Sequence, residues 1–107
     1  MSNSFSKRAG VVWKLKLPIN YEKSDWRKRK QAREQYCKEQ GWLCSHCGES
    51  LYDEPSKEIL TKPINGKLFP PTMFDHPIHL HHCHKTGITI GVVHAKCNAV
   101  LWQYHGE

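Results

Sequence analysis

The chain has no apolar run of the roughly 18–20 residues that a membrane-spanning helix needs. Its first residues also lack the apolar core of a secretion signal. We therefore expect a cytoplasmic protein without a membrane partner. The composition, 38% apolar and 24% charged over 107 residues, predicts one folded domain spanning residues 1–107.

The chain also lacks an even number of cysteines, since it has five Cys beside eight His. In a reducing compartment this argues against a disulfide framework and favours metal ligands. A chain of this length buries a limited core, so a bound metal would add needed stability. Two pairs share one spacing, Cys44-x-x-Cys47 and His94-x-x-Cys97, and together they predict a tetrahedral structural zinc site. Two alternatives stay open: His94 is an ordinary residue at a strand end, or Cys83 replaces it as ligand.

Acidic residues are scarce in the first half of the chain. Residues 1–50 hold 11 Lys or Arg against 5 Asp or Glu, whereas residues 51–107 hold 5 of each. Such a cationic half is typical of proteins that bind a polyanion, although a merely solubilising surface has the same composition.

The basic residues concentrate in a predicted helix over Asp25–Gln40, with Ser24 as its N-cap. Before it, residues 1–23 form a basic arm with one strand-like piece around Val11–Leu17. We expect the helix to contact DNA phosphates without reading sequence through Arg27, Lys28, Arg29, Lys30 and Arg33, supported by Lys7, Arg8, Lys14 and Lys16.

The second half predicts an α+β fold. Residues 53–77 contain five of the six prolines and indicate turns, loop and short extended pieces. Two strands are expected at Ile78–Cys83 and Ile88–Val93, followed by a helix over Ala95–Tyr104. This helix would present Cys97, Leu101 and Tyr104 on one face.

Three histidines within four residues, His81, His82 and His84, form the densest chemical signal. A strand, a turn, a strand and a helix would fold them against Asn98. One imidazole and an amide oxygen can then hold a divalent cation while a second imidazole takes a proton from water. Neighbouring strand residues point to opposite faces, so a shared site requires a twist, a bulge or a strand end between His81 and His82.

The run HLHHCHKTGITIGVVHAKCN, with the upstream Cys pair, resembles the HNH or ββα-metal endonucleases. The branch that it resembles most is the phage endonuclease VII type, together with small phage HNH nicking enzymes. The resemblance covers about residues 42–102 and implies a zinc-stapled ββα-metal core within residues 42–107, preceded by the basic arm and helix of residues 1–41. It assigns His81 and Asn98 to a catalytic Mg²⁺ or Mn²⁺, His82 to the general base and His84 to the scissile phosphate.

The resemblance therefore implies a metal-dependent DNA endonuclease that nicks with low sequence specificity. Two alternatives stay open: a zinc-knuckle nucleic-acid-binding module that does not cut, and a junction resolvase that prefers branched DNA. By family analogy the protein has a phage or prophage origin and partners in packaging or recombination. The remaining histidines are expected outside the site, with His46 and His105 exposed and His76 and His79 on its approach.

Overall fold

The described residues form an α+β fold with a two-stranded antiparallel sheet. The computed structural model describes residues 15–106. Within this range no helix combines the length and the apolar content that a membrane span requires. The elements in chain order are α2 (Trp26–Glu39), α3 (Lys57–Thr61), the 3-10 turns η1 (Gly66–Leu68) and η2 (Met73–Asp75), β1 (Ile78–His82), β2 (Thr89–His94) and α4 (Ala95–His105).

The hairpin and the last helix match the sequence prediction to within one residue at each end. The turn between the strands closes through Gly87, whose φ of 77° favours glycine and whose amide donates to the Cys83 carbonyl at 2.7 Å. Strand β2 leads directly into α4. The chain order is thus strand, strand, helix.

The hairpin is irregular at the two histidines. The register pairs His81 with Gly91 and His82 with Thr89, so Ile90 is an extra residue on β2. Such a bulge bends the strand and increases its twist. The extra residue lies on β2, so His81 and His82 remain consecutive residues of β1, and they differ in burial: His81 is buried and His82 is half-buried.

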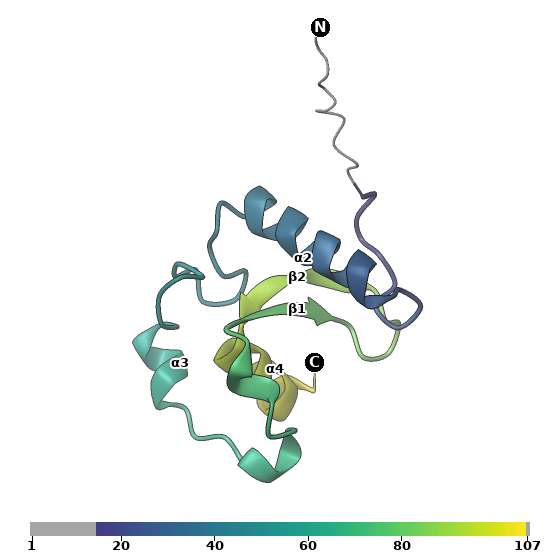
Figure 1. Ribbon diagram of the computed structural model, residues 1–107. Coiled ribbons are helices and arrows are strands. Elements are labelled where there is room, and N and C mark those ends of the chain that lie inside the picture. Colours follow the sequence, from purple (N-terminus) through teal and green to yellow (C-terminus); the bar gives the residue numbers. More distant parts are fainter. Residues whose placement is uncertain (1–14, 107) are drawn as a thin grey trace, which may run out of the picture.

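The hairpin lies between α2 and α4, and each helix contacts both strands (Figure 1). Burial is complete at Ala32 of α2, at Val92 and Val93 of β2 and at Val100 of α4, which together form the centre of the core. Removing these apolar surfaces from water supplies most of the driving force for folding. Of the residues expected on one face of α4, Cys97 and Leu101 are buried, but Tyr104 is exposed.

The structure corrects the start of the basic helix. Its N-cap is Asp25, whose carboxylate accepts the Lys28 amide at 2.9 Å. Ser24 is engaged elsewhere, because its hydroxyl donates to the Asn20 carbonyl at 2.6 Å. Asp25 fits the N-cap better, since a carboxylate both accepts an orphan amide and complements the helix dipole.

The proline-rich segment is more helical than its composition predicted. Residues 53–77 contain α3, η1 and η2, and no strand. Ile59 is buried and fixes α3 against the core. A five-residue helix is too short for its apolar periodicity to stand out in a sequence. The basic positions Lys7, Arg8 and Lys14, and most of the expected strand-like piece, lie outside the described residues.

The side chain of Gln40, the C-cap of α2, forms hydrogen bonds with backbone groups at the edge of β2. The Gln40 amide accepts the Val92 N–H at 2.9 Å and donates to the Val92 carbonyl at 3.0 Å. It also donates to the Leu43 carbonyl at 2.7 Å. These bonds satisfy backbone groups at the edge of the sheet that would otherwise need water.

We expect Gln40→Ala to destabilise the zinc-loaded protein by about 1–3 kcal/mol, because it leaves the N–H of the fully buried Val92 without its partner, while the Val92 carbonyl keeps the Ser45 amide. Urea unfolding followed by circular dichroism measures the change. Lys38→Ala, an exposed change near the end of the same helix, is the control and should stay within about 0.5 kcal/mol of wild type. Equal midpoints for Gln40→Ala and wild type would contradict this role.

Candidate functional site

Four side chains of the types that bind metals converge where the loop after α2 meets the junction of β2 and α4. The sulfur atoms of Cys44, Cys47 and Cys97 and a ring nitrogen of His94 all lie within 4.8 Å of one another. Two sulfurs, those of Cys44 and Cys97, are 3.7 Å apart, and His94 Nδ1 lies 3.5 Å from Cys47 Sγ and 3.7 Å from Cys97 Sγ. A tetrahedral zinc site requires about 3.8 Å between sulfurs and about 3.6 Å between sulfur and nitrogen. The cluster can therefore hold a metal such as zinc.

The surroundings of the cluster suit thiolate and imidazole ligands. The ring nitrogen Nε2 of His94 donates to the Ser50 carbonyl at 2.8 Å, which leaves Nδ1 as the ligand atom. The Cys44 sulfur accepts the amides of His46 and Cys47 at 3.4 and 3.5 Å. The hydrogen bond with Cys97, together with these amides, lowers the pKa of Cys44 and favours the thiolate that binds metal.

The structure decides between the alternatives for the fourth ligand. His94 joins the cluster, whereas Cys83 does not belong to it. Cys37 is buried in α2, as expected for a core residue, and burial raises the pKa of its thiol. The four side chains that could hold a metal are thus the two pairs that the sequence spacing indicated, Cys44 with Cys47 and His94 with Cys97.

We expect Cys44→Ala to lose the bound zinc and to lower or abolish the cooperative melting transition, because structural zinc contributes folding free energy directly. Zinc content per chain and thermal unfolding measure the two effects. In the matched control, Cys83→Ala should keep one zinc per chain and the wild-type transition. A Cys44→Ala protein with full zinc content and unchanged melting would show that the cluster is not a metal site.

A second group of side chains lies around the end of β1. The His82 ring stacks on Tyr21 with centroids 4.0 Å apart and planes within 6°. The guanidinium of Arg29 lies 3.9 Å from the centre of the same Tyr21 ring and donates to the Tyr21 carbonyl at 2.8 Å. On its other flank His82 contacts the His84 ring, whose centroid is 4.9 Å away. These contacts hold the His82 imidazole in one orientation.

The protonation of His82 follows from these surroundings. Partial burial lowers its pKa, and the nearby charges of His84 and His81 lower it further, against an opposing effect of Glu22. A histidine with a lowered pKa is mostly neutral at pH 7 and can accept a proton. The ring is therefore in the form that a general base requires.

A cavity of about 530 Å³ opens beside His82. It is lined by His79, His82 and Asn98 on one side and by Arg29 and Arg33 of α2 on another. An imidazole base, an amide and two guanidiniums thus face one volume. Guanidinium groups bind phosphate well, because their N–H groups match pairs of phosphate oxygens.

The orientation of Asn98 is set by a histidine that sequence reasoning had placed only on the approach. The Asn98 amide nitrogen lies 3.1 Å from His79 Nδ1, and His79 Nε2 lies 2.7 Å from the Met73 carbonyl. The ring therefore donates to Met73 and accepts from Asn98. Because the amide nitrogen is engaged, the amide oxygen is the atom that Asn98 can offer to a cation. No spacing in the sequence distinguishes His79 from His81, because residues two apart lie on the same face of an ideal strand.

The histidines of the expected catalytic group are separated by the fold. His82 and Asn98 line the cavity described above, and His84 and Asn98 line a neighbouring one. His81 is only 5% exposed and lines neither of these two cavities. Outside the group, His46 and His105 are exposed, as expected.

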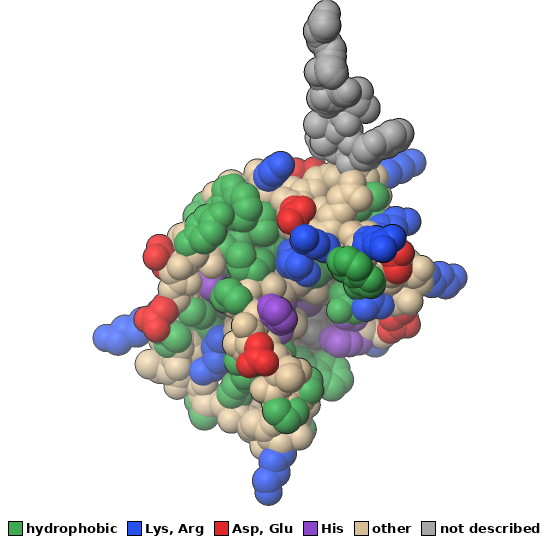
Figure 2. All heavy atoms as spheres, in the orientation of Figure 1, with side chains coloured by type: hydrophobic (Ala, Val, Ile, Leu, Met, Phe, Trp, Pro, Cys, Tyr) green, Lys and Arg blue, Asp and Glu red, His purple; other side chains and the backbone are tan. Residues whose placement is uncertain are grey.

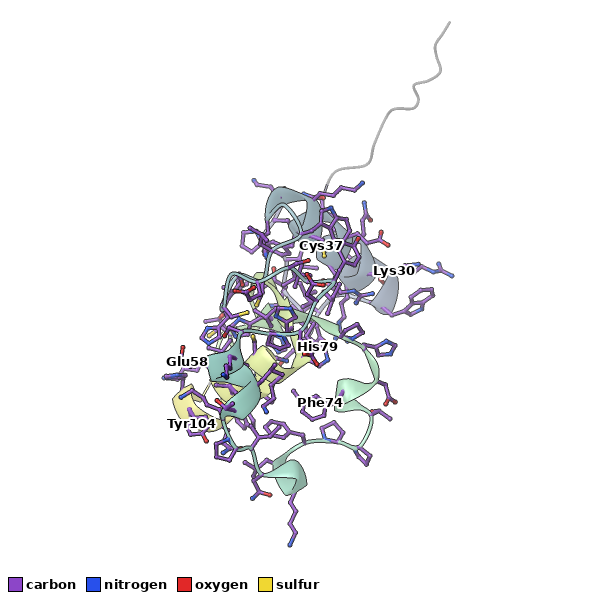
Figure 3. All side chains as sticks on the ribbon, turned by 90° about the vertical axis from the view of Figure 1, so that its left-hand side faces the viewer. Lys30, Cys37, Glu58, Phe74, His79 and Tyr104 are labelled. Carbon is purple, nitrogen blue, oxygen red and sulfur yellow. The ribbon has the colours of Figure 1, made fainter. Side chains whose placement is uncertain are left out.

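The basic side chains of α2 divide into two sets. Arg29 and Arg33 line the cavity, whereas Arg27, Lys28 and Lys30 are exposed. Arg27 lies over the exposed Trp26 ring at 5.3 Å. Figure 2 shows basic side chains over α2 close to histidine side chains on the same face. In Figure 3 Lys30 points away from the molecule, while His79 lies near its centre.

Comparisons with protein-family models, with curated proteins and with solved structures find no match for this chain. The functional assignment therefore depends on the residues and their geometry.

Proposed function

We propose that the protein is a metal-dependent DNA endonuclease that hydrolyses phosphodiester bonds and nicks one strand at a time. The observation that carries the proposal is the cavity in which the neutral imidazole of His82 faces Arg29 and Arg33. Proton acceptance and phosphate binding are both needed for hydrolysis, and few other functions need them in one volume.

Three residues that line the cavity have separate tasks in this proposal. His82 accepts the proton of the attacking water at a ring nitrogen. Arg29 and Arg33 bind the oxygens of the scissile phosphate and orient it. Stacking on Tyr21 keeps the imidazole fixed, which lowers the entropy lost in reaching the reactive geometry.

A divalent cation would be held through the amide oxygen of Asn98, whereas His81, which the resemblance assigns to the same cation, is buried and lines neither cavity. When bound, it would polarise the phosphate and stabilise the leaving oxygen. No carboxylate is among the described side chains that line the cavity, and its other metal-binding groups are imidazoles, so this lining fits Mn²⁺ better than Mg²⁺, which prefers oxygen ligands.

The finer assignment to a ββα-metal nuclease is supported by the order of the elements. A hairpin leads directly into a helix, with the cysteine and histidine cluster at their junction. Ligand Asn98 follows Cys97 on that helix, as the resemblance requires.

A non-catalytic nucleic-acid-binding module is the second candidate. The exposed Arg27, Lys28 and Lys30 favour it, because phosphate contacts by surface cations require no catalytic group. Such a module would have no use for a base fixed by Tyr21. Cleavage therefore separates the two candidates.

We expect His82→Ala to slow plasmid nicking by about 10²–10⁴-fold, because it removes the general base. Supercoiled plasmid is incubated with zinc-loaded protein and added Mn²⁺ or Mg²⁺, and relaxation is followed on gels. Protein without an added cation is the blank, since a chelator would also remove metal from the cysteine cluster. Nicking should be faster with Mn²⁺ than with Mg²⁺.

His105→Ala is the matched control, because this exposed histidine lies at the far end of α4. It should nick at the wild-type rate, and both variants should bind DNA as wild type does. Wild-type nicking by His82→Ala would exclude His82 as the base. A wild-type protein that binds DNA but does not nick it with either cation would favour the binding module.

We expect Arg33→Ala to weaken DNA binding and to reduce the slope of log K against log salt by about 1, because one phosphate contact is lost. Fluorescence anisotropy at several salt concentrations measures both. Lys38→Ala removes the same charge outside the cavity and should leave the slope nearly unchanged. Equal slopes for Arg33→Ala and Lys38→Ala would place the phosphate elsewhere.

A further inference from the structure

We propose that a second cavity beside the catalytic one binds an unpaired nucleobase of the DNA substrate. This inference rests on the proposed function and names the kind of DNA that the site accepts. The cavity has a volume of about 430 Å³ and is bounded by the segment around η1 and η2 and by α4.

The lining of this cavity combines apolar walls with a few polar groups. The walls come from Leu68, Phe69, Met73 and Trp102, and the polar side comes from His84 and Asn98 among others. A nucleobase has apolar aromatic faces and a polar edge, and proteins bind unpaired bases by stacking them on aromatic side chains. The volume lies in the range of pockets that take small ligands.

The aromatic wall is accessible and fixed. Trp102 is 42% exposed and contacts the His84 ring at 4.8 Å between centroids. Phe69 is held edge-on by Phe74, with centroids 6.4 Å apart. An exposed, supported ring beside a reactive cluster offers a stacking surface at little cost in ordering.

The position of the cavity ties its occupant to the phosphate site. His76, His79 and Asn98 line both this cavity and the one that contains Arg29 and Arg33. The two cavities are therefore adjacent, so one DNA strand can place a phosphate in the first cavity and a neighbouring base in the second.

Charge also favours nucleic acid as the occupant. No acidic side chain is among the described residues that line either of these two cavities. A third cavity, by contrast, is lined by Asp53 and Glu54. A cationic ligand would find no counter-charge in the first two cavities, whereas a DNA strand meets guanidiniums at one end and an aromatic wall at the other.

Base pairing in the DNA determines whether a base can enter this cavity. In a continuous duplex every base is stacked and paired, so a base must be extruded before it can enter the cavity. A nucleotide that is already unpaired, as at a bulge or a branch point, avoids this cost. The cavity should therefore distinguish DNA that presents an unpaired base from DNA with an abasic site at the same position.

Binding of three hairpin DNAs to zinc-loaded wild-type protein, without added divalent cation, tests the inference. One DNA is fully paired, one carries a single bulged adenine, and one carries an abasic bulge at the same position. By anisotropy the adenine bulge should bind about tenfold more tightly than the other two, the effect of stacking one base. Equal binding of the adenine and abasic bulges would overturn the inference, because only backbone distortion would then be recognised.

Two variants locate the effect. Trp102→Ala and Leu68→Ala, both at partly exposed positions, should each reduce the preference for the adenine bulge over the abasic one. Tyr52→Ala is the control, since Tyr52 is 72% exposed and lines the third cavity. Thermal melting identifies any variant that fails to fold. Wild-type preference in both folded variants would overturn the assignment to this cavity.

The binding measurement is independent of cleavage, so the two proposals can fail separately. Nicking without a preference for the unpaired base would overturn the base site and leave the nuclease. A preference for the unpaired base without nicking would support the base site and overturn the nuclease.

Discussion

The convergence of Cys44, Cys47, His94 and Cys97 is the constraint on which the rest of the structure depends. It joins the loop after α2 to the point where β2 becomes α4. Both helices contact the hairpin, so this junction positions the two walls of the candidate site relative to each other. A small core with few fully buried large side chains gains most from such a link.

The second group of side chains lies at the turn end of the same hairpin, whereas His94 belongs to its other end. His82 is the last residue of β1 before the turn, and stacking on Tyr21 fixes its ring. Arg29 contacts the Tyr21 ring and also lines the cavity beside the His82 imidazole. Tyr21 thus contacts both the His82 imidazole and the Arg29 guanidinium and links the orientations of these two groups.

The two cavities share a single border of His76, His79 and Asn98. Arg29 and Arg33 line one of them beside apolar residues, whereas Phe69 and Trp102 line the other. This division matches the two parts of a nucleotide, a charged phosphate and an aromatic base. The hydrogen bonds from Asn98 through His79 to Met73 hold the border in place, because each of the three groups has a defined donor or acceptor role.

Much of this arrangement follows from local sequence. The spacing of the two metal-ligand pairs, the β-branched strands around Gly87 and the basic helix are encoded in short segments, because turns, strands and helices depend on near neighbours. The partners of individual side chains are not local. Asp25 rather than Ser24 caps α2, His79 rather than His81 meets Asn98, and Tyr21 stacks on His82 from a distant part of the chain. Those pairings depend on the path of the backbone through the bulge and around the core, and only the tertiary structure decides it.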